Sequence, residues 1–404
     1  MSRRSATVWR SAIAVFICTM CVVTPANAQP SQAETSSNTS GRFEISPRGY
    51  VQFDWRGYPD WTVATGSGRL EYETFAVRRL RAGIDGQWRR MAFELSVDPM
   101  DDLDDTLIKD AYIQIRLTRA LRLRGGQFKL PGSREYGTSA RSLDFLERSA
   151  FAQSIAPGRD IGGMVFGELG RRFAYEAGLF AGDGNGRNSR SGITTAGRVV
   201  WNGPRGVELA GSFAEGRTTA VDADPANGLE GRSASGYRFF ERLYVDGRRT
   251  RVGGDARWTP GRWQVSAEAM RVRDERAGQG LDLEDLPGAI GTGWSAAVTR
   301  EFGRRPGPTR SRLREWALGI RFDALEFDDE GPETLEESVR PRATDVRARA
   351  GQTLTTGISW NFSRWARVMG NASLERYVEE RSAPEPGNRG LYWAFGTRLQ
   401  IQMP

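Results

Sequence analysis

Histidine is absent from this 404-residue chain, cysteine and lysine each occur twice, and beyond residue 28 no apolar run is long enough for a membrane-spanning helix. Without histidine, the usual general base for a serine or threonine nucleophile is missing, so we expect no enzyme and no catalytic residue. Both cysteines, Cys18 and Cys21, lie within residues 1–28, which leaves the rest of the chain without thiol chemistry. We expect neither a bound metal nor a cofactor.

Residues 1–28 have the features of a secretory signal peptide. Arg3, Arg4 and Arg10 precede an apolar core at residues 13–23, and a small-x-small cleavage site ends at Ala28. The alternative is an N-terminal membrane anchor, but the apolar core is shorter than the ~20 residues that such a helix needs. Cleavage would remove three arginines and no acidic residue, and so lower the net charge from +7 to +4.

Apolar and polar residues alternate in many segments after residue 49, as at 111–117, 367–375 and 391–401. In a helix these apolar residues would surround the axis, whereas in a strand they share one face. Such strands suit a barrel with one face toward lipid and the other toward water. The sequence therefore predicts an all-β transmembrane antiparallel β-barrel at 49–404, after a periplasmic lead-in at 29–48. A soluble β-sandwich is the alternative.

The connections alternate between short and long, as expected for periplasmic turns and external loops. Placing residues 237–245 within a long loop preserves this alternation and gives sixteen strands, with fourteen or eighteen as alternatives. The turn near 303–312 is longer than the rule expects. The long connections are 57–74, 99–106, 130–160, 183–193, 216–249, 274–289, 328–344 and 381–388.

Tryptophan placement supports the barrel. Indole prefers a membrane interface because it is apolar and has one N–H group to satisfy. A belt of tryptophans is therefore expected at the periplasmic rim. The tryptophans beside the shorter connections are Trp88, Trp201, Trp258, Trp263, Trp316, Trp360 and Trp365.

The alternation also assigns charged residues to the lumen, because the positions between the lipid-facing residues point inward. A bulge at Gly125 and Gly126 is expected to reset the alternation so that Lys129 faces the lumen, whereas the pattern points Lys109 outward. With two arginines from the loop at 130–160, the expected pore-lining residues are all basic: Arg79, Arg81, Arg116, Arg122, Arg124, Lys129, Arg134 and Arg159.

Guanidinium groups match the geometry of phosphate and carboxylate, so a row of them favours an anion path. The same strands also carry Asp85, Glu94, Asp98 and Asp110. Over the whole barrel the inward charges nearly balance. This leaves open a general, weakly selective pore, in which paired arginines and carboxylates only stiffen the wall.

The connection at 130–160 is the long third loop, and it contains a patch at 142–152 that looks helical. A loop of this length is usually functional or disordered. We expect it to fold inward and constrict the pore. An external lid without a role in conduction is the alternative.

Two motifs resemble the phosphate-selective porin O and P family. The first is Gly-Gln-Phe-Lys-Leu-Pro, ending at Pro131, and the second is Phe-Leu-Glu-Arg, ending at Arg148. Further blocks at 159–162, 182–186 and 248–258 extend the resemblance over most of the chain. It implies a homotrimeric sixteen-stranded porin whose third loop folds into the lumen, with an arginine ladder and a pore role for Lys129. The chain departs from the family in having only two lysines and in ending without an aromatic residue.

Together these features predict an outer-membrane porin, a passive channel for small anions, with phosphate or polyphosphate favoured. The alternatives are a general porin and a structural or adhesive barrel. Expected partners are small anions, outer-membrane lipid, lipopolysaccharide and further copies of the chain, but no nucleic acid.

Overall fold

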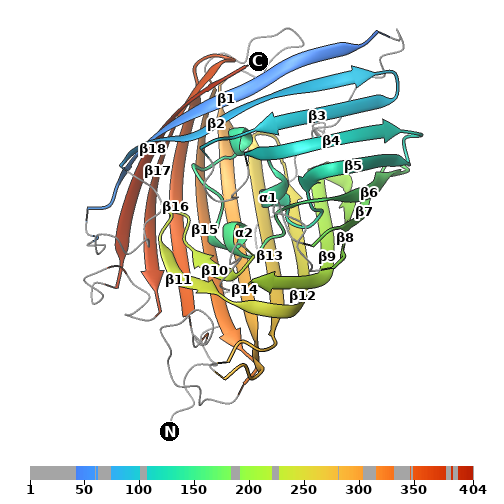
Figure 1. Cartoon of the computed structure of the whole chain (residues 1–404). Helices are drawn as coiled ribbons and strands as arrows, with labels where there is room; N and C mark the ends of the chain where they lie inside the picture. Colours follow the sequence, from blue (N-terminus) through green and yellow to red (C-terminus); the bar gives the residue numbers. More distant parts are fainter. Residues whose placement is uncertain are drawn as a thin grey trace.

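The computed structural model closes sixteen antiparallel strands of its described residues into one barrel (Figure 1). Neighbouring barrel strands are consecutive in sequence, except that β9 pairs with β12 and β1 with β18. No helix within the described residues is long and apolar enough to cross a membrane. The described residues are 42–59, 61, 74–100, 107–182, 192–220, 227–280, 282–303, 315–331, 346, 349–378, 384 and 390–403.

The strands begin and end close to the positions that the sequence predicts. The first begins at Glu44, within the predicted lead-in at 29–48. The predicted signal peptide at 1–28 lies outside the described residues, as do most of the connections at 57–74, 99–106, 183–193, 303–312, 328–344 and 381–388. The barrel strands are β1 (Glu44–Gly57), β2 (Phe75–Trp88), β3 (Met91–Val97), β4 (Ile108–Arg116), β5 (Arg122–Lys129), β6 (Arg159–Leu169), β7 (Phe173–Phe180), β8 (Thr194–Asn202), β9 (Val207–Ala220), β12 (Val245–Trp258), β13 (Trp263–Arg276), β14 (Leu286–Phe302), β15 (Glu315–Asp329), β16 (Arg349–Asn361), β17 (Ala366–Tyr377) and β18 (Tyr392–Gln402).

Two short strands lie outside the barrel sheet. β10 (Leu229–Arg232) and β11 (Arg238–Leu243) pair only with each other in the described part of the chain. They form a hairpin within the loop between β9 and β12, so residues 237–244 of the predicted 237–245 belong to a loop, and Val245 begins β12. The predicted count of sixteen strands is confirmed with it.

Alternating side chains give the barrel an apolar outer face and a polar inner face. In β18, Phe395, Leu399 and Ile401 are exposed, while Arg398 and Gln400 between them are buried. The predicted rim tryptophans follow the same rule: Trp88, Trp258, Trp263, Trp316 and Trp365 are exposed beside the connections at one end. The outer face is therefore the one expected to meet lipid.

Bulges change which residues face inward, and the sequence misplaces them. The pairing of β1 with β2 shifts at Arg78, so Arg78 and Arg79 are both buried. A similar shift in the pairing of β3 with β4 makes Lys109 an extra, fully buried residue, and its predicted outward position is wrong.

The bulge predicted at Gly125 and Gly126 is also wrong. The described residues of β5 pair in continuous register with both β4 and β6. Glycine is needed at 126 for another reason: its φ is +129°, and a Cβ there would lie 2.2 Å from the carbonyl oxygen of Ala111.

The connection from β5 to β6 (residues 130–158) lies against the inner wall and contains α1 (Arg134–Gly137), η3 (Ala140–Ser142) and α2 (Ala150–Ser154). Figure 1 draws α1 and α2 within the ring of strands. Glycines in the wall make room for this segment. A Cβ at Gly293 would lie 2.4 Å from the Cβ of Phe151, and a Cβ at Gly396 would lie 2.7 Å from Leu146.

We predict that Gly293→Ala destabilises the barrel, because the new methyl group overlaps Phe151 in α2. Overpacking of this kind costs about 1–3 kcal/mol. The measurement is the temperature at which the folded band converts to the unfolded band on a semi-native gel. Gly211→Ala is the matched control, since a Cβ there meets no atom within 4 Å. Equal transition temperatures for both variants would contradict the packing of α2 against β14.

Candidate pore-lining site

Three of the predicted arginines lie together on the inner face of β4 and β5. Arg116 is directly opposite Arg122, and Arg124 is opposite Gln114. Leu123 between the two β5 arginines is exposed on the outer face, as the alternation requires. Arg124 donates a hydrogen bond of 2.8 Å to Gln114, and its guanidinium carbon lies 4.3 Å from the ring centre of Tyr112.

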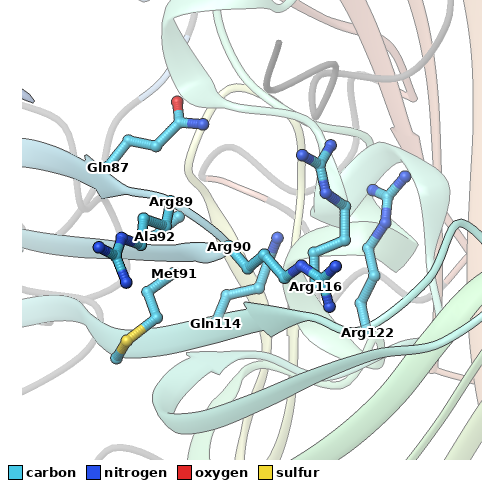
Figure 2. Close-up of a pocket in the computed structure, with 8 residues that line it drawn as sticks. All are labelled: Gln87, Arg89, Arg90, Met91, Ala92, Gln114, Arg116 and Arg122. Carbon is cyan, nitrogen blue, oxygen red and sulfur yellow. The ribbon is translucent and has the colours of Figure 1, made fainter. Parts of the chain in front are cut away.

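A small pocket opens beside these arginines at the end of the barrel with the tight turns. Figure 2 shows Arg116 and Arg122 extending side by side in the same direction, with the head of Arg90 next to Arg116. The guanidinium of Arg122 lies 3.6 Å from the carboxylate of Glu168. The pocket is lined by Gln87, Arg89, Arg90, Met91, Ala92, Gln114, Arg116 and Arg122. Four arginines, Arg89, Arg90, Arg116 and Arg122, thus line one small pocket.

Arg79 and Arg81 both sit on the inner face of β2, but they lie apart from this pocket. The guanidinium of Arg81 is 3.6 Å from Asp98, whose side chain is fully buried. Arg79 is 2.7 Å from Glu147 of the loop and donates a 3.0 Å hydrogen bond to Gln52. Both arginines therefore hold the wall or the loop as well as contributing charge.

Lys129 holds the loop. Its ammonium Nζ donates to the carbonyl oxygens of Tyr136, Gly137 and Thr138 at 2.8, 3.2 and 3.1 Å. These carbonyls end α1 and have no partner of their own within the helix. The other end of α1 is held by Glu268 of β13, which accepts hydrogen bonds from the backbone N–H groups of residues 134 and 135.

Arg134 and Arg159 are each paired with an acid of the wall. Arg134 reaches Asp255 of β12 at 3.1 Å, and Arg159 binds both carboxylate oxygens of Asp110 at 3.2 and 3.1 Å. Arg198 of β8 also pairs with Asp255. Through Arg134, the loop that follows β5 reaches β12.

A second basic cluster, which the sequence did not identify, surrounds Glu147. Of the described arginines, four lie within salt-bridge distance of this carboxylate; they form the arginine cluster, Arg56, Arg78, Arg79 and Arg398. Arg56 and Arg398 could have been inferred from the alternation in β1 and β18. Arg78 could not, because it faces inward only through a bulge.

The cluster determines the charge state of the loop carboxylate. Burial alone would raise the pKa of Glu147, but the surrounding arginines, Arg78 foremost, hold it well below its ordinary value of 4.5. The ion pairs therefore persist as the pH falls through the range in which an exposed glutamate is protonated. Their stabilising contribution is lost only at more acidic pH.

Apolar side chains join the loop to the β10–β11 hairpin. Phe151 and Ile155 of the loop and Leu243 of the hairpin are fully buried, and Phe240 stacks on Phe327 of β15 with ring centres 4.6 Å apart. The wall residues of this apolar cluster come from β9, β12 to β15, β17 and β18. In the strand order, β4 and β5 lie across the ring from β14 and β15. The basic pocket and the apolar cluster therefore occupy opposite sides of the interior.

The described residues contain no group of three histidine, cysteine, aspartate or glutamate side chains that could hold a metal ion. Of the predicted basic residues, Arg116, Arg122 and Arg124 are brought together. The remaining ones line the wall or the loop in separate ion pairs and hydrogen bonds.

We predict that Lys129→Met destabilises the loop, because the carbonyl oxygens of Tyr136 and Gly137 lose their charged donor and that of Thr138 keeps only Arg148. Loss of a charged donor to these half-buried and exposed acceptors costs about 1 kcal/mol. The measurement is the thermal unfolding midpoint in detergent, with Lys129→Arg as the control that keeps a donor and the charge. A midpoint for Lys129→Met equal to that of the unmodified chain would contradict this role.

Comparisons with known proteins agree with this geometry. The barrel is similar to three solved structures, with fractions given first for this chain and then for the other. OmpT from Vibrio cholerae (trimer form) is 13% identical, with 89% of this chain and 99% of OmpT covered and a TM-score of 0.53. The anion-selective porin from Comamonas acidovorans is 12% identical, with 90% and 100% covered and a TM-score of 0.52. The outer membrane channel DcaP of Acinetobacter baumannii is 10% identical, with 91% and 99% covered and a TM-score of 0.56. At these identities the similarity shows the fold alone.

No curated protein matches the sequence. The sequence profile of one family, phosphate-selective porin O and P, matches residues 51–403, nearly the whole of the barrel. This match confirms the resemblance seen in the two motifs around Lys129 and Glu147. The barrel is that of an outer-membrane porin channel, and the chain belongs to the phosphate-selective porin O and P family.

Proposed function

We propose that small anions diffuse passively through this barrel along the wall formed by β4 and β5, with phosphate or polyphosphate as the favoured solute. The observation that carries the proposal is the pairing of Arg116 directly opposite Arg122, with Arg90 in the same pocket. Like charges directly opposite each other destabilise a sheet. An anion passing between them offsets this repulsion, so the arrangement suits a path for negative charge.

The chemistry of the pocket suits an oxoanion. Guanidinium groups bind phosphate oxygens through two parallel N–H donors, and they keep their charge at every physiological pH. Because the pocket is open, the groups replace only part of the hydration of the ion. Binding weak enough to allow release is what conduction requires. No catalytic step, metal or cofactor has a part in this mechanism.

The third loop serves in this proposal as the constriction. Residues 130–158 reach from β5 to Asp255 on β12 and to Glu268 on β13, and α2 packs with the β10–β11 hairpin on the side of the interior opposite β4 and β5. The remaining polar path then runs past Arg124, Arg122 and Arg116. An external lid would not need these contacts with the inner wall.

A general, weakly selective porin is the second candidate, and one observation favours it. Arg79, Arg81, Arg134 and Arg159 each lie within salt-bridge distance of a carboxylate. Such pairs shape the field across a pore without selecting phosphate. Phosphate at low concentration distinguishes the two candidates, because only a selective site should let it block chloride current.

We further propose that the chain is exported by cleavage after residue 28 and assembles as a homotrimer in contact with outer-membrane lipid and lipopolysaccharide. β3, β5 and β7 have 7, 8 and 8 residues, fewer than the ~9–11 that a lipid-facing strand needs to span the bilayer. The part of the barrel from β3 to β7 is therefore short along the membrane normal, and it is suited to contact with neighbouring copies of the chain. One of the similar structures is described as a trimer form.

We predict that Arg122→Ala lowers the anion-to-cation permeability ratio measured from the reversal potential under a KCl gradient. One charge beside an aqueous path is worth on the order of 0.5–1 kcal/mol, which corresponds to about a two- to fivefold change in the ratio. Arg300→Ala is the matched control, because Arg300 is exposed on the outer face and lies over the ring of Trp263.

The unmodified channel should show a reversal potential of anion sign, and phosphate should reduce its chloride current. A reversal potential of cation sign would overturn the anion path. An equal ratio for Arg122→Ala and the unmodified channel would remove the β5 wall from that path. Anion preference without phosphate block would favour the general porin.

A further inference from the structure

Glu147 lies among guanidinium groups that come from three neighbouring strands of the wall. Its Oε1 is 3.0 Å from Arg56 of β1, 3.1 Å from Arg78 of β2 and 2.7 Å from Arg398 of β18, and its Oε2 is 2.7 Å from Arg79 of β2. All five side chains are buried, with 8% or less exposed. The loop therefore contributes one carboxylate to a site whose other members belong to the barrel.

Wall residues hold three of the four arginines of the cluster, Arg56, Arg79 and Arg398. Asp54 of β1, directly opposite Arg398 in register, accepts two hydrogen bonds from it at 2.6 and 2.7 Å and a third from Arg56 at 2.7 Å. Gln52 accepts a hydrogen bond from Arg79. The bulge between β1 and β2 brings Arg78 to the same face. The guanidinium groups are thus positioned by residues of the strands themselves.

The charges of this site show what it is built to hold. Among the described residues, Arg56 and Arg398 pair with Asp54 of the wall, and all four arginines of the cluster lie within salt-bridge distance of Glu147. Guanidinium groups arranged in this way bind an anion with two or more oxygens, such as a carboxylate or phosphate. Two oxygens of Glu147 already occupy these positions.

We propose that the arginine cluster is an oxoanion-binding site of the barrel wall, and that Glu147 is its tethered ligand, which fixes the third loop across the lumen. While Glu147 is bound, the cluster is closed to permeating ions. The neighbouring backbone strengthens this attachment: the carbonyl oxygen of Leu146 accepts a 2.5 Å hydrogen bond from Arg398, and the Leu146 side chain packs at Gly396. The inference does not depend on which solute the channel conducts.

The test removes the Glu147 carboxylate by mutation and adds a free oxoanion, acetate or phosphate, in solution. In Glu147→Ala, the part of the loop around residue 147 should lose its attachment to β1, β2 and β18, which lowers the thermal midpoint of the purified protein in detergent and raises its single-channel conductance. Inorganic phosphate or acetate, added at constant ionic strength against chloride, should then raise the midpoint progressively with concentration, because either anion refills the cluster. The unmodified protein should show no such rise, since Glu147 already occupies the site.

Asp144→Asn is the matched control. It removes a carboxylate from the same loop, one that accepts a hydrogen bond from Gln264 rather than from the cluster. This variant should gain no stability from phosphate or acetate. An equal response of Glu147→Ala and Asp144→Asn to either anion would overturn the proposal.

Should Glu147→Ala not refold, its refolding yield becomes the measurement. A yield that rises with acetate or phosphate, but not with chloride, supports the tethered ligand, and a yield indifferent to all three anions contradicts it. The reversal potential of the unmodified channel is measured separately. The reversal potential tests the proposed anion path, whereas the thermal midpoint or refolding yield of Glu147→Ala tests the arginine cluster, so the two proposals can be contradicted separately.

Discussion

Every strand residue of a closed barrel faces either outward or inward, and most of this structure follows from that constraint. Closure leaves no sheet edge, so the polar residues between the outward apolar ones must share one interior. Arginine supplies nearly all of the positive charge there, and buried arginine needs a partner. The ion pairs of Arg81, Arg159 and Arg398 with wall acids meet this need. The wall gathers arginines most closely in two places, the β4–β5 pocket and the arginine cluster.

The third loop uses both kinds of contact that the interior offers. Its apolar residues, such as Phe151 and Leu146, lie against glycines of the wall, and its charged residues bind wall groups of opposite sign. α1 is held at both ends, by Glu268 and by Lys129. A loop anchored at so many points behaves as part of the wall. The loop and the hairpin also contribute to one apolar cluster.

The sequence was sufficient to predict the barrel, its sixteen strands and its rim tryptophans, since each depends on local alternation and connection length. It failed where pairing between strands decides the outcome. Lys109 and Arg78 face inward because of bulges, which a single strand does not reveal. The role of Glu147 depends on Arg398, 251 residues away in the chain. The motif lysine, Lys129, was predicted to line the pore, and its contacts are with loop carbonyl oxygens, which no spacing rule predicts.

The central claim is that the β5 arginines line the water-filled side of the barrel. The chain has no cysteine beyond residue 21, so single cysteines can be introduced without background reaction. In a planar bilayer, a charged, water-soluble methanethiosulfonate reagent should change the current through Arg122→Cys and leave that through Leu123→Cys unaltered. A response at 123 without one at 122 would contradict the inward position of the arginines and the anion path built on it.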